Sequence, residues 1–279
     1  MGVIMSAFAY YNGSFDLFEN IRIPLSDRAV FFGDGVYDAA LGAGDKIFLL
    51  DRHIERFLGN AARLKINTDL TADRLREILY SVVKKCNLDC FFLYFQLSRA
   101  LPERIHSNLA SRKSNLLVTV KETKVPNPTP MRLHVMEDLR YYYCDIKTLN
   151  LLPQTLYASE AESRGCDECV LHRFNVVTEC SHSNVSIIKD GVLYTHPKSR
   201  LILPGITRDC MLALCERAGI PFKEVPFSLK ELYEADDIIV TSTSRLACTA
   251  TVGDLTKKAT PIGKKICDGL KKQFVEFAL

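Results

Sequence analysis

The sequence lacks the features that would place the protein in a membrane or on a nucleic acid. None of its apolar runs reaches the roughly 18 residues needed to cross a bilayer. The N-terminal stretch contains no basic region typical of a signal peptide. Lysine and arginine (36) nearly balance aspartate and glutamate (33), so the net charge is only +3 and creates no global field for polyanions. We expect a cytoplasmic protein that binds neither nucleic acid nor membrane.

Motifs of three large enzyme groups are also absent. The chain contains no GxxxxGKS or GxxxxGKT, no HExxH and no GxSxG, which are typical of nucleoside triphosphatases, zinc proteases and α/β hydrolases. Its ten cysteines are scattered over a long chain, which favours reduced thiols over a disulfide scaffold. Cys166 and Cys169 form a lone CxxC pair, and because a structural zinc site needs four ligands, we predict no metal site.

What is present is a mixture of helix and strand patterns in an ordinary globular composition of 47% hydrophobic and 25% charged residues. Branched and aromatic runs predict strands, and apolar residues at helical spacing predict helices. The elements do not alternate regularly, so we predict a mixed α/β (α+β) fold without a doubly wound sheet. The expected strands are residues 46–50, 91–97, 116–120 and 238–242, and the expected helices include 155–164, 207–218 and 262–277.

Several local signals predict where these elements begin and turn. Asp51 and Thr71 are suitable N-caps for two helices in the first half of the chain. Asp190-Gly191 lies between two apolar runs, a strong hairpin signal within residues 184–196. Ser228 and Glu231 have the spacing of a capping box.

The segment Lys121–Pro130, KETKVPNPTP, is the best candidate for a domain boundary, because proline interrupts both helices and strand ladders. We predict a smaller N-terminal α/β domain over residues 1–122 and a linker over 123–130. A larger C-terminal α/β domain over 131–279 would then carry Lys147.

Three polar clusters could hold an anionic cofactor. Lys147 is flanked by apolar residues in CDIKTLNLL, and partial burial would favour a neutral, nucleophilic amine; a lysine that reaches outward from a loop is the simpler alternative. Gly205-Ile206-Thr207 precedes a helix whose first N–H groups could hold a phosphate, although Thr207 could equally be an ordinary N-cap. Residues 241–244, TSTS, offer hydroxyl groups or form a polar turn.

Together with other short stretches, these clusters resemble one family. The matching stretches occur in the expected order and cover nearly the whole chain: FFGDGVYDA (31–39), HIER (53–56), YFQLSR (94–99), RIH (104–106), CDIKTLNLL (144–152), VTECSHSN (177–184), IIKDGVLYTH (187–196), LPGITRD (203–209) and VTSTS (240–244). The chain resembles the class-IV (fold type IV) pyridoxal-phosphate aminotransferases, and among them most closely the D-amino-acid aminotransferases. The resemblance implies a two-domain fold type IV architecture and the cofactor pyridoxal 5'-phosphate.

The resemblance also implies the roles of individual residues. Lys147 matches the lysine that binds the cofactor covalently and then moves the substrate's α-proton, and is the expected catalytic residue. Glu179 matches the acid that faces the pyridine nitrogen, where a carboxylate keeps that nitrogen protonated. The remaining cofactor contacts are implied at the phosphate, where Arg56 matches the clamping arginine. Ile206, Thr207, Ser242 and Thr243 match the other phosphate contacts. From the sequence alone, Arg56 could instead pair with Asp51 or Glu55.

Substrate binding is implied at three further positions. Tyr37, Arg104 and His106 match the side chains that hold the substrate α-carboxylate in the D-amino-acid enzymes, and an arginine with a second donor suits a carboxylate. In the resembled enzymes the Arg-x-His pair comes from the neighbouring subunit, so a homodimer is implied. A solvated basic loop is the alternative for residues 104–106.

The implied reaction is ping-pong transamination between a D-amino acid such as D-alanine and a 2-oxo acid such as pyruvate or 2-oxoglutarate. A branched-chain L-amino-acid aminotransferase and an aminodeoxychorismate lyase of the same fold are alternatives, and so is a non-catalytic dimer that only binds pyridoxal phosphate. The chain departs from the family pattern at Cys180 and His182, at Arg245 with the following LACTATVGD, and in the sequence ALPE (100–103) ahead of Arg104. These departures are expected to affect the substrate side-chain preference more than the reaction.

Overall fold

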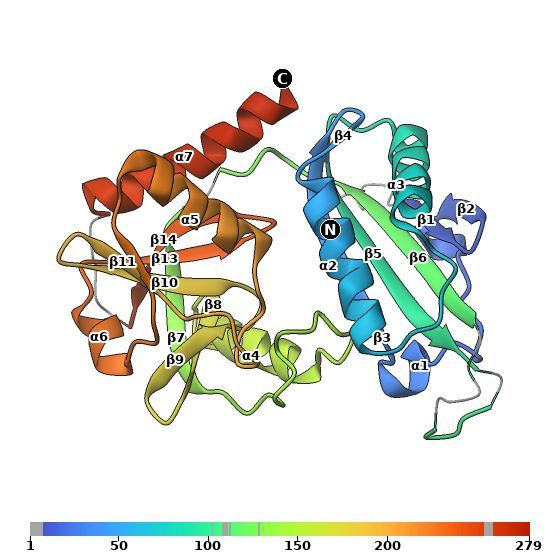
Figure 1. Cartoon of the computed structure of the whole chain (residues 1–279), viewed down its shortest axis with the longest axis horizontal. Coiled ribbons are helices and arrows are strands. Elements are labelled where there is room, and N and C mark those ends of the chain that lie inside the picture. Colours follow the sequence, from blue (N-terminus) through green and yellow to red (C-terminus); the bar gives the residue numbers. More distant parts are fainter. Residues whose placement is uncertain (1–7, 102, 108–110, 112, 128, 254–258) are drawn as a thin grey trace. The chain divides into compact units, whose positions relative to one another are not determined.

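The chain divides into two compact units in the computed structural model (Figure 1). The first unit comprises Met1–Val125, Ile146–Asn150 and Phe277–Leu279, and the second comprises Pro126–Asp145 and Leu151–Glu276. The chain passes between units inside the expected linker, but the segment with Lys147 groups with the first unit and not with the C-terminal one, which corrects the expected division. The structure describes residues 8–101, 103–107, 111, 113–127, 129–253 and 259–279.

The first unit is built on one antiparallel sheet. Its six strands lie in the order β2-β1-β6-β5-β3-β4, and every neighbouring pair is antiparallel. The strands are β1 (Phe8–Tyr11), β2 (Ser14–Leu17), β3 (Gly35–Ala43), β4 (Lys46–Ile47), β5 (Cys90–Ala100) and β6 (Lys113–Glu122). The helices are η1 (Phe18–Asn20), α1 (Ala29–Phe32), α2 (Leu50–Arg63) and α3 (Ala72–Cys86).

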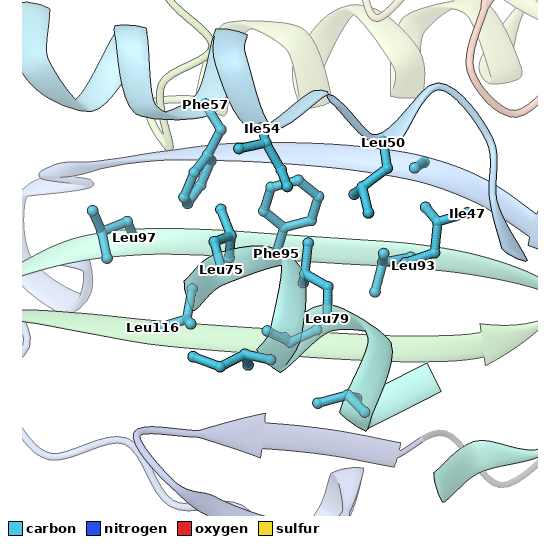
Figure 2. Close-up of a cluster of buried hydrophobic side chains, with 14 of the residues drawn as sticks. Ile47, Leu50, Ile54, Phe57, Leu75, Leu79, Leu93, Phe95, Leu97 and Leu116 are labelled. Atoms are coloured by element: carbon cyan, nitrogen blue, oxygen red, sulfur yellow. The ribbon is translucent and has the colours of Figure 1, made fainter. Parts of the chain in front are cut away.

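The core of this unit follows from strand alternation. Leu93, Phe95 and Leu97 of β5 are at most 1% exposed and face α2 and α3, whereas Tyr94 and Gln96 between them are only partly buried on the opposite face. Figure 2 shows the β5 side chains interleaved with those of both helices. Because one face is closed by helices, polar side chains on the other face remain available for a site.

The second unit contains an eight-stranded mixed sheet in the order β12-β11-β10-β13-β14-β7-β8-β9. Its strands are β7 (Met131–Glu137), β8 (Glu168–Arg173), β9 (Val176–Cys180), β10 (Asn184–Lys189), β11 (Val192–Thr195), β12 (Phe222–Glu224), β13 (Asp237–Ser242) and β14 (Leu246–Val252). Its helices are α4 (Leu152–Ser163), α5 (Ile206–Ala218), α6 (Leu229–Glu234) and α7 (Pro261–Ala278), the last two residues of α7 grouping with the first unit. The mixed α/β class expected from the sequence is confirmed.

Several local predictions are confirmed, and those at residues 46–51 need correction. The side chain of Thr71 caps α3, and Ser228 with Glu231 forms a complete capping box on α6. Asp51 is not a cap, because α2 already begins at Leu50 after Leu49 takes a left-handed conformation (φ 54°). The expected strand 46–50 is therefore cut short, since only Lys46 and Ile47 are in β4, Phe48 and Leu49 form a turn, and Leu50 begins α2.

Among the residues that the structure describes, no helix combines the length and apolar character needed to cross a bilayer.

Candidate active site

The segment Ile146–Asn150 lies along β3, which explains its place in the first unit. The main-chain N–H of Tyr37 donates to the carbonyl of Lys147 (2.9 Å), and the N–H of Leu149 donates to the carbonyl of Gly35 (3.0 Å). The lysine is thus held by main-chain pairing of the kind that joins strands in a sheet. This distinguishes it from a lysine on an unsupported loop.

The Lys147 side chain is partly buried, between the buried residues Ile146 and Thr148. Its Nζ lies 4.3 Å from the centre of the Tyr37 ring. The Tyr37 ring in turn stacks on Tyr94, with ring centres 5.4 Å apart. An ammonium over an aromatic face is favourable, and the tyrosine pair gives the lysine a defined position on the sheet face opposite the helices.

Arg56 of α2 makes a different ion pair from those considered in the sequence. Its Nε and Nη2 donate to the two carboxylate oxygens of Asp38, both at 2.8 Å, and His53 Nδ1 lies 2.8 Å from the same carboxylate. Burial alone would favour neutral Asp38, but the Arg56 charge and the His53 hydrogen bond outweigh it and hold the Asp38 pKa well below its usual range. Asp38 is not among the partners, Asp51 and Glu55, that the sequence offers as the alternative to phosphate binding by Arg56.

The loop with Arg104 and His106 is exposed, but both side chains contact the ring of Phe32. The guanidinium carbon of Arg104 lies 5.3 Å from the centre of the Phe32 ring. The His106 ring meets the same phenylalanine edge-on, at 5.6 Å between ring centres. The Phe32 ring therefore contacts two of the three side chains assigned to carboxylate binding, Arg104 and His106. The third, Tyr37, lies in β3.

In the second unit, Glu179 is a buried carboxylate with three hydrogen-bond donors. It accepts from Arg140 Nη1 (2.6 Å), Asn184 Nδ2 (3.0 Å) and the main-chain N–H of Leu203 (2.9 Å). Burial raises the pKa of Glu179 to about 7, with the Arg140 charge acting in the opposite direction. A carboxyl group with a pKa near neutrality can share a proton with a basic group bound next to it. Sequence reasoning missed Arg140 and assigned no role to Asn184, because their link to Glu179 depends on tertiary structure.

The N-terminus of α5 has the properties of an anion site. Its N-cap is Gly205, which supplies no side-chain cap, so the first N–H groups of Ile206 and Thr207 have no acceptor within the helix. A Cβ at Gly205 would lie 2.0 Å from Asn184 Oδ1, so only glycine fits. Thr207 is buried inside the first turn and is not the cap, which corrects that alternative.

Ser242 and Thr243 follow directly at the end of β13. Both are partly buried. The Ser242 hydroxyl accepts a hydrogen bond from the main-chain N–H of Arg245 at 3.3 Å, so Arg245 helps to shape the turn. The expected hydroxyl pair is thus held at a strand end.

The departures Cys180 and His182 lie in different environments. Cys180 is fully buried in the hydrophobic core of the second unit. His182 is exposed, and its Nδ1 lies 3.0 Å from the fully buried carboxylate of Glu168. Burial would raise the Glu168 pKa, but the hydrogen bond from His182 and the hydroxyls of Ser181 and Ser183 hold it below its ordinary value. Nothing in the sequence pattern signalled Glu168.

The part of the chain that the structure describes contains no cluster of three or more histidine, cysteine, aspartate or glutamate side chains able to hold a metal ion. Two features instead fit an anionic, nitrogen-containing cofactor. An uncapped helix N-terminus suits a phosphate, and a buried, hydrogen-bonded carboxylate suits a protonated ring nitrogen.

Comparison with known proteins identifies the family. The model of the family "Amino-transferase class IV" matches residues 35–250. The chain therefore belongs to the class IV aminotransferases and is an enzyme of that class, which confirms the resemblance inferred from the sequence.

Individual relatives agree with this assignment. The chain is 37% identical over 232 residues to a D-alanine aminotransferase of Listeria monocytogenes serotype 4b, covering 81% of this chain and 80% of the relative. It is 32% identical over 273 residues to a D-alanine aminotransferase of Staphylococcus haemolyticus, covering 94% and 96%. A branched-chain aminotransferase from the archaeon Thermoproteus uzoniensis has the same fold, with a TM-score of 0.89, 21% identity, and coverage of 98% and 96%.

Proposed function

We propose that the protein transfers an amino group between a D-amino acid, with D-alanine as the model donor, and a 2-oxo acid such as pyruvate or 2-oxoglutarate, with pyridoxal phosphate as cofactor. Relatives named D-alanine aminotransferases, 32–37% identical over most of the chain, support this proposal. The observation that carries it in the structure is the placement of Arg104 and His106 against one aromatic ring. A guanidinium beside a second donor suits a carboxylate.

The cofactor, when bound, supplies an electrophilic carbon for the amino group and a ring that withdraws electrons from the substrate α-carbon. Lys147 Nζ would hold that carbon covalently and, once displaced by substrate, would move the α-proton as a general base and acid. The Tyr37 ring beneath Nζ limits where this amine can go. Glu179 in its ionised form would hold a proton on the ring nitrogen, with its own position fixed by Arg140 and Asn184.

The phosphate would be bound by several groups of this chain. The N–H groups of Ile206 and Thr207 provide two donors at the positive end of α5. The hydroxyls of Ser242 and Thr243 provide two more at the end of β13. Arg56 would add a positive charge, and its two bonds to Asp38 fix the orientation of its guanidinium group.

The test is the visible spectrum of the purified protein before and after D-alanine, together with 2-oxo acid formation. We expect D-alanine to bleach the visible band of the bound cofactor, and pyruvate to accumulate steadily only when 2-oxoglutarate is added. Parallel reactions with L-leucine and with aminodeoxychorismate test the two alternatives of the same fold. Faster turnover of L-leucine than of D-alanine would remove the D-amino acid from the proposal.

Two variants test the assigned roles. Lys147→Ala should abolish transamination, and borohydride reduction of the wild type followed by peptide mapping should place the cofactor on residue 147. Arg104→Ala should weaken substrate binding and leave the cofactor spectrum unchanged. A non-catalytic binding protein, the third alternative, predicts a bound cofactor that D-alanine does not bleach.

We also propose that the enzyme is a cytoplasmic homodimer. None of the ten cysteines, all of which the structure describes, forms a disulfide, which fits a reducing compartment. The Arg104–His106 loop is exposed on a single chain, as expected if it serves a neighbouring subunit. Sedimentation of the purified protein checks the dimer, and a monomer with full activity would contradict it.

A further inference from the structure

The buried side chain of Arg28 donates hydrogen bonds to the main chain of the loop Arg104–His106, the substrate loop. Arg28 is 4% exposed. Its Nη1 donates to the carbonyl of Ile105 (2.6 Å), and its Nη2 donates to the carbonyl of His106 (3.2 Å). Its Nε donates to Asp34 at 2.7 Å. A single rigid guanidinium therefore fixes two consecutive peptide units of the loop and is itself fixed by a carboxylate.

The main chain that carries Arg28 is anchored to the sheet through its neighbour Asp27. The Asp27 carboxylate is fully buried and accepts hydrogen bonds from Ser98 Oγ (2.8 Å), Asn115 Nδ2 (3.0 Å) and the Tyr11 hydroxyl (3.2 Å). These donors come from β5, β6 and β1. The position of Arg28 is thus set by three strands of the sheet.

Phe32 of α1 adds a second contact, this time to the loop's side chains. The guanidinium carbon of Arg28 lies 4.3 Å from the centre of its ring. The ring also meets Arg104 and His106, as described above. The exposed substrate loop consequently has a rigid support beneath both its backbone and its two functional side chains.

We infer that Arg28 is a positioning residue of the transamination reaction, which orients Arg104 and His106 for the substrate carboxylate through the backbone of the substrate loop. The inference rests on the proposed function of that loop. Fixing the loop in advance removes an entropic cost that substrate binding would otherwise bear. Lysine cannot replace Arg28 here, because an ammonium lacks the planar fork that reaches two carbonyls and a carboxylate together.

Arg99 provides a matched control. It is equally buried, at 3% exposed, and its Nε also donates to Asp34, at 3.0 Å. Its Nη1 and Nη2, however, donate to the carbonyls of Lys65 and Leu64, away from the substrate loop. Arg28→Lys and Arg99→Lys therefore remove similar bonds from similar environments, one bond to Asp34 included in each case. Because, of these two, only Arg28 donates to the carbonyls of Ile105 and His106, we expect only the first variant to release the loop.

The experiment compares these two variants with the wild type as holoenzymes, using D-alanine and 2-oxoglutarate. We expect Arg28→Lys to raise KM for D-alanine roughly tenfold or more, as expected for the loss of charge-assisted hydrogen bonds, with a much smaller change in kcat. The cofactor spectrum should stay unchanged, and Arg99→Lys should keep the wild-type KM. If both variants change KM equally, or neither does, the inference is wrong.

Limited trypsin digestion gives a second readout that does not depend on catalysis. Arg104 is exposed, so cleavage after it, mapped by mass spectrometry, reports the mobility of the substrate loop. We expect faster cleavage in Arg28→Lys than in Arg99→Lys and the wild type, and equal rates would overturn the inference. If Arg28→Lys does not fold, Phe32→Leu, which keeps apolar volume and loses the ring, takes its place. If the wild type does not use D-alanine, the proposed function fails, and the trypsin comparison alone decides whether Arg28 holds the loop.

Discussion

Replacing Asp38 by asparagine should destabilise the first unit strongly, because its carboxylate is the buried partner of two side chains on α2. The carboxylate accepts from Arg56 twice and lies 2.8 Å from His53 Nδ1. In Asp38→Asn one oxygen becomes an amide that donates, so an Arg56 N–H faces another N–H and the guanidinium loses its counter-charge. Breaking a buried pair in this way costs about 3–5 kcal/mol.

The sign of the pH dependence follows from the lowered pKa of Asp38. A carboxyl whose pKa is lower in the folded state contributes stability above its unfolded pKa of about 3.9, and loses it as the pH falls through the folded value. The difference between wild type and Asp38→Asn should therefore be full at pH 7 and should narrow below pH 4.

Asp51→Asn is the control, since Asp51 also accepts from an arginine, Arg76, at 2.8 Å, but its side chain is 82% exposed. Such a pair contributes about 1 kcal/mol or less. The measurement is urea unfolding followed by circular dichroism, because the chain has no tryptophan, with hydrogen exchange over residues 35–63. If Asp38→Asn costs no more than Asp51→Asn, the argument from the buried ion pair is refuted.

Three further predictions concern other parts of the chain. In cofactor-free protein, burial raises the pKa of Glu179 to about 7, so the folded state binds its proton more tightly than the unfolded state. The stabilisation is full below pH 4.5 and is lost as the pH rises through 7. Glu179→Gln should reduce this pH-dependent change in the unfolding free energy by roughly 3 kcal/mol. Ser228→Ala removes the cap of α6 and should cost about 1 kcal/mol, seen as faster hydrogen exchange in that helix. Gly35→Ala would place a Cβ 2.6 Å from the carbonyl oxygen of Leu97 and should cost about 1–3 kcal/mol by thermal unfolding. Gly59→Ala, with nothing within 4 Å, should stabilise α2 by about 0.5–1 kcal/mol, and a similar loss at both glycines would contradict the steric argument.

The sequence predicts elements well where the signal is local. The aromatic and branched run at residues 91–97 predicts a strand, and the structure confirms it as part of β5 (Cys90–Ala100). Thr71 and Asp51 are both good capping residues, but only Thr71 has the extended backbone that a cap requires. At Asp51 the cap position is already taken by Leu49, so α2 begins at Leu50 and Asp51 lies inside its first turn.

The candidate site was less predictable, because its supporting contacts join residues far apart in the chain. The family resemblance supplied Arg56 and Glu179, but their partners Asp38 and Arg140 lie 18 and 39 residues away. Neither partner has a local pattern that separates it from a surface charge. The placement of Lys147 failed for the same reason, since only its main-chain pairing with β3 assigns it to the first unit.

The discontinuous make-up of the first unit has a consequence for how the protein is synthesised. All six strands of its sheet lie within the first 125 residues, but the stretch of β3 around Gly35 gains its partner only when Ile146–Asn150 emerge from the ribosome. Lys46 and Phe48 gain their contacts with Phe277 later still. The last contacts of the first unit can therefore form only when nearly the whole chain has been synthesised. A fragment that stops at residue 122 would expose an unpaired strand edge, which invites aggregation.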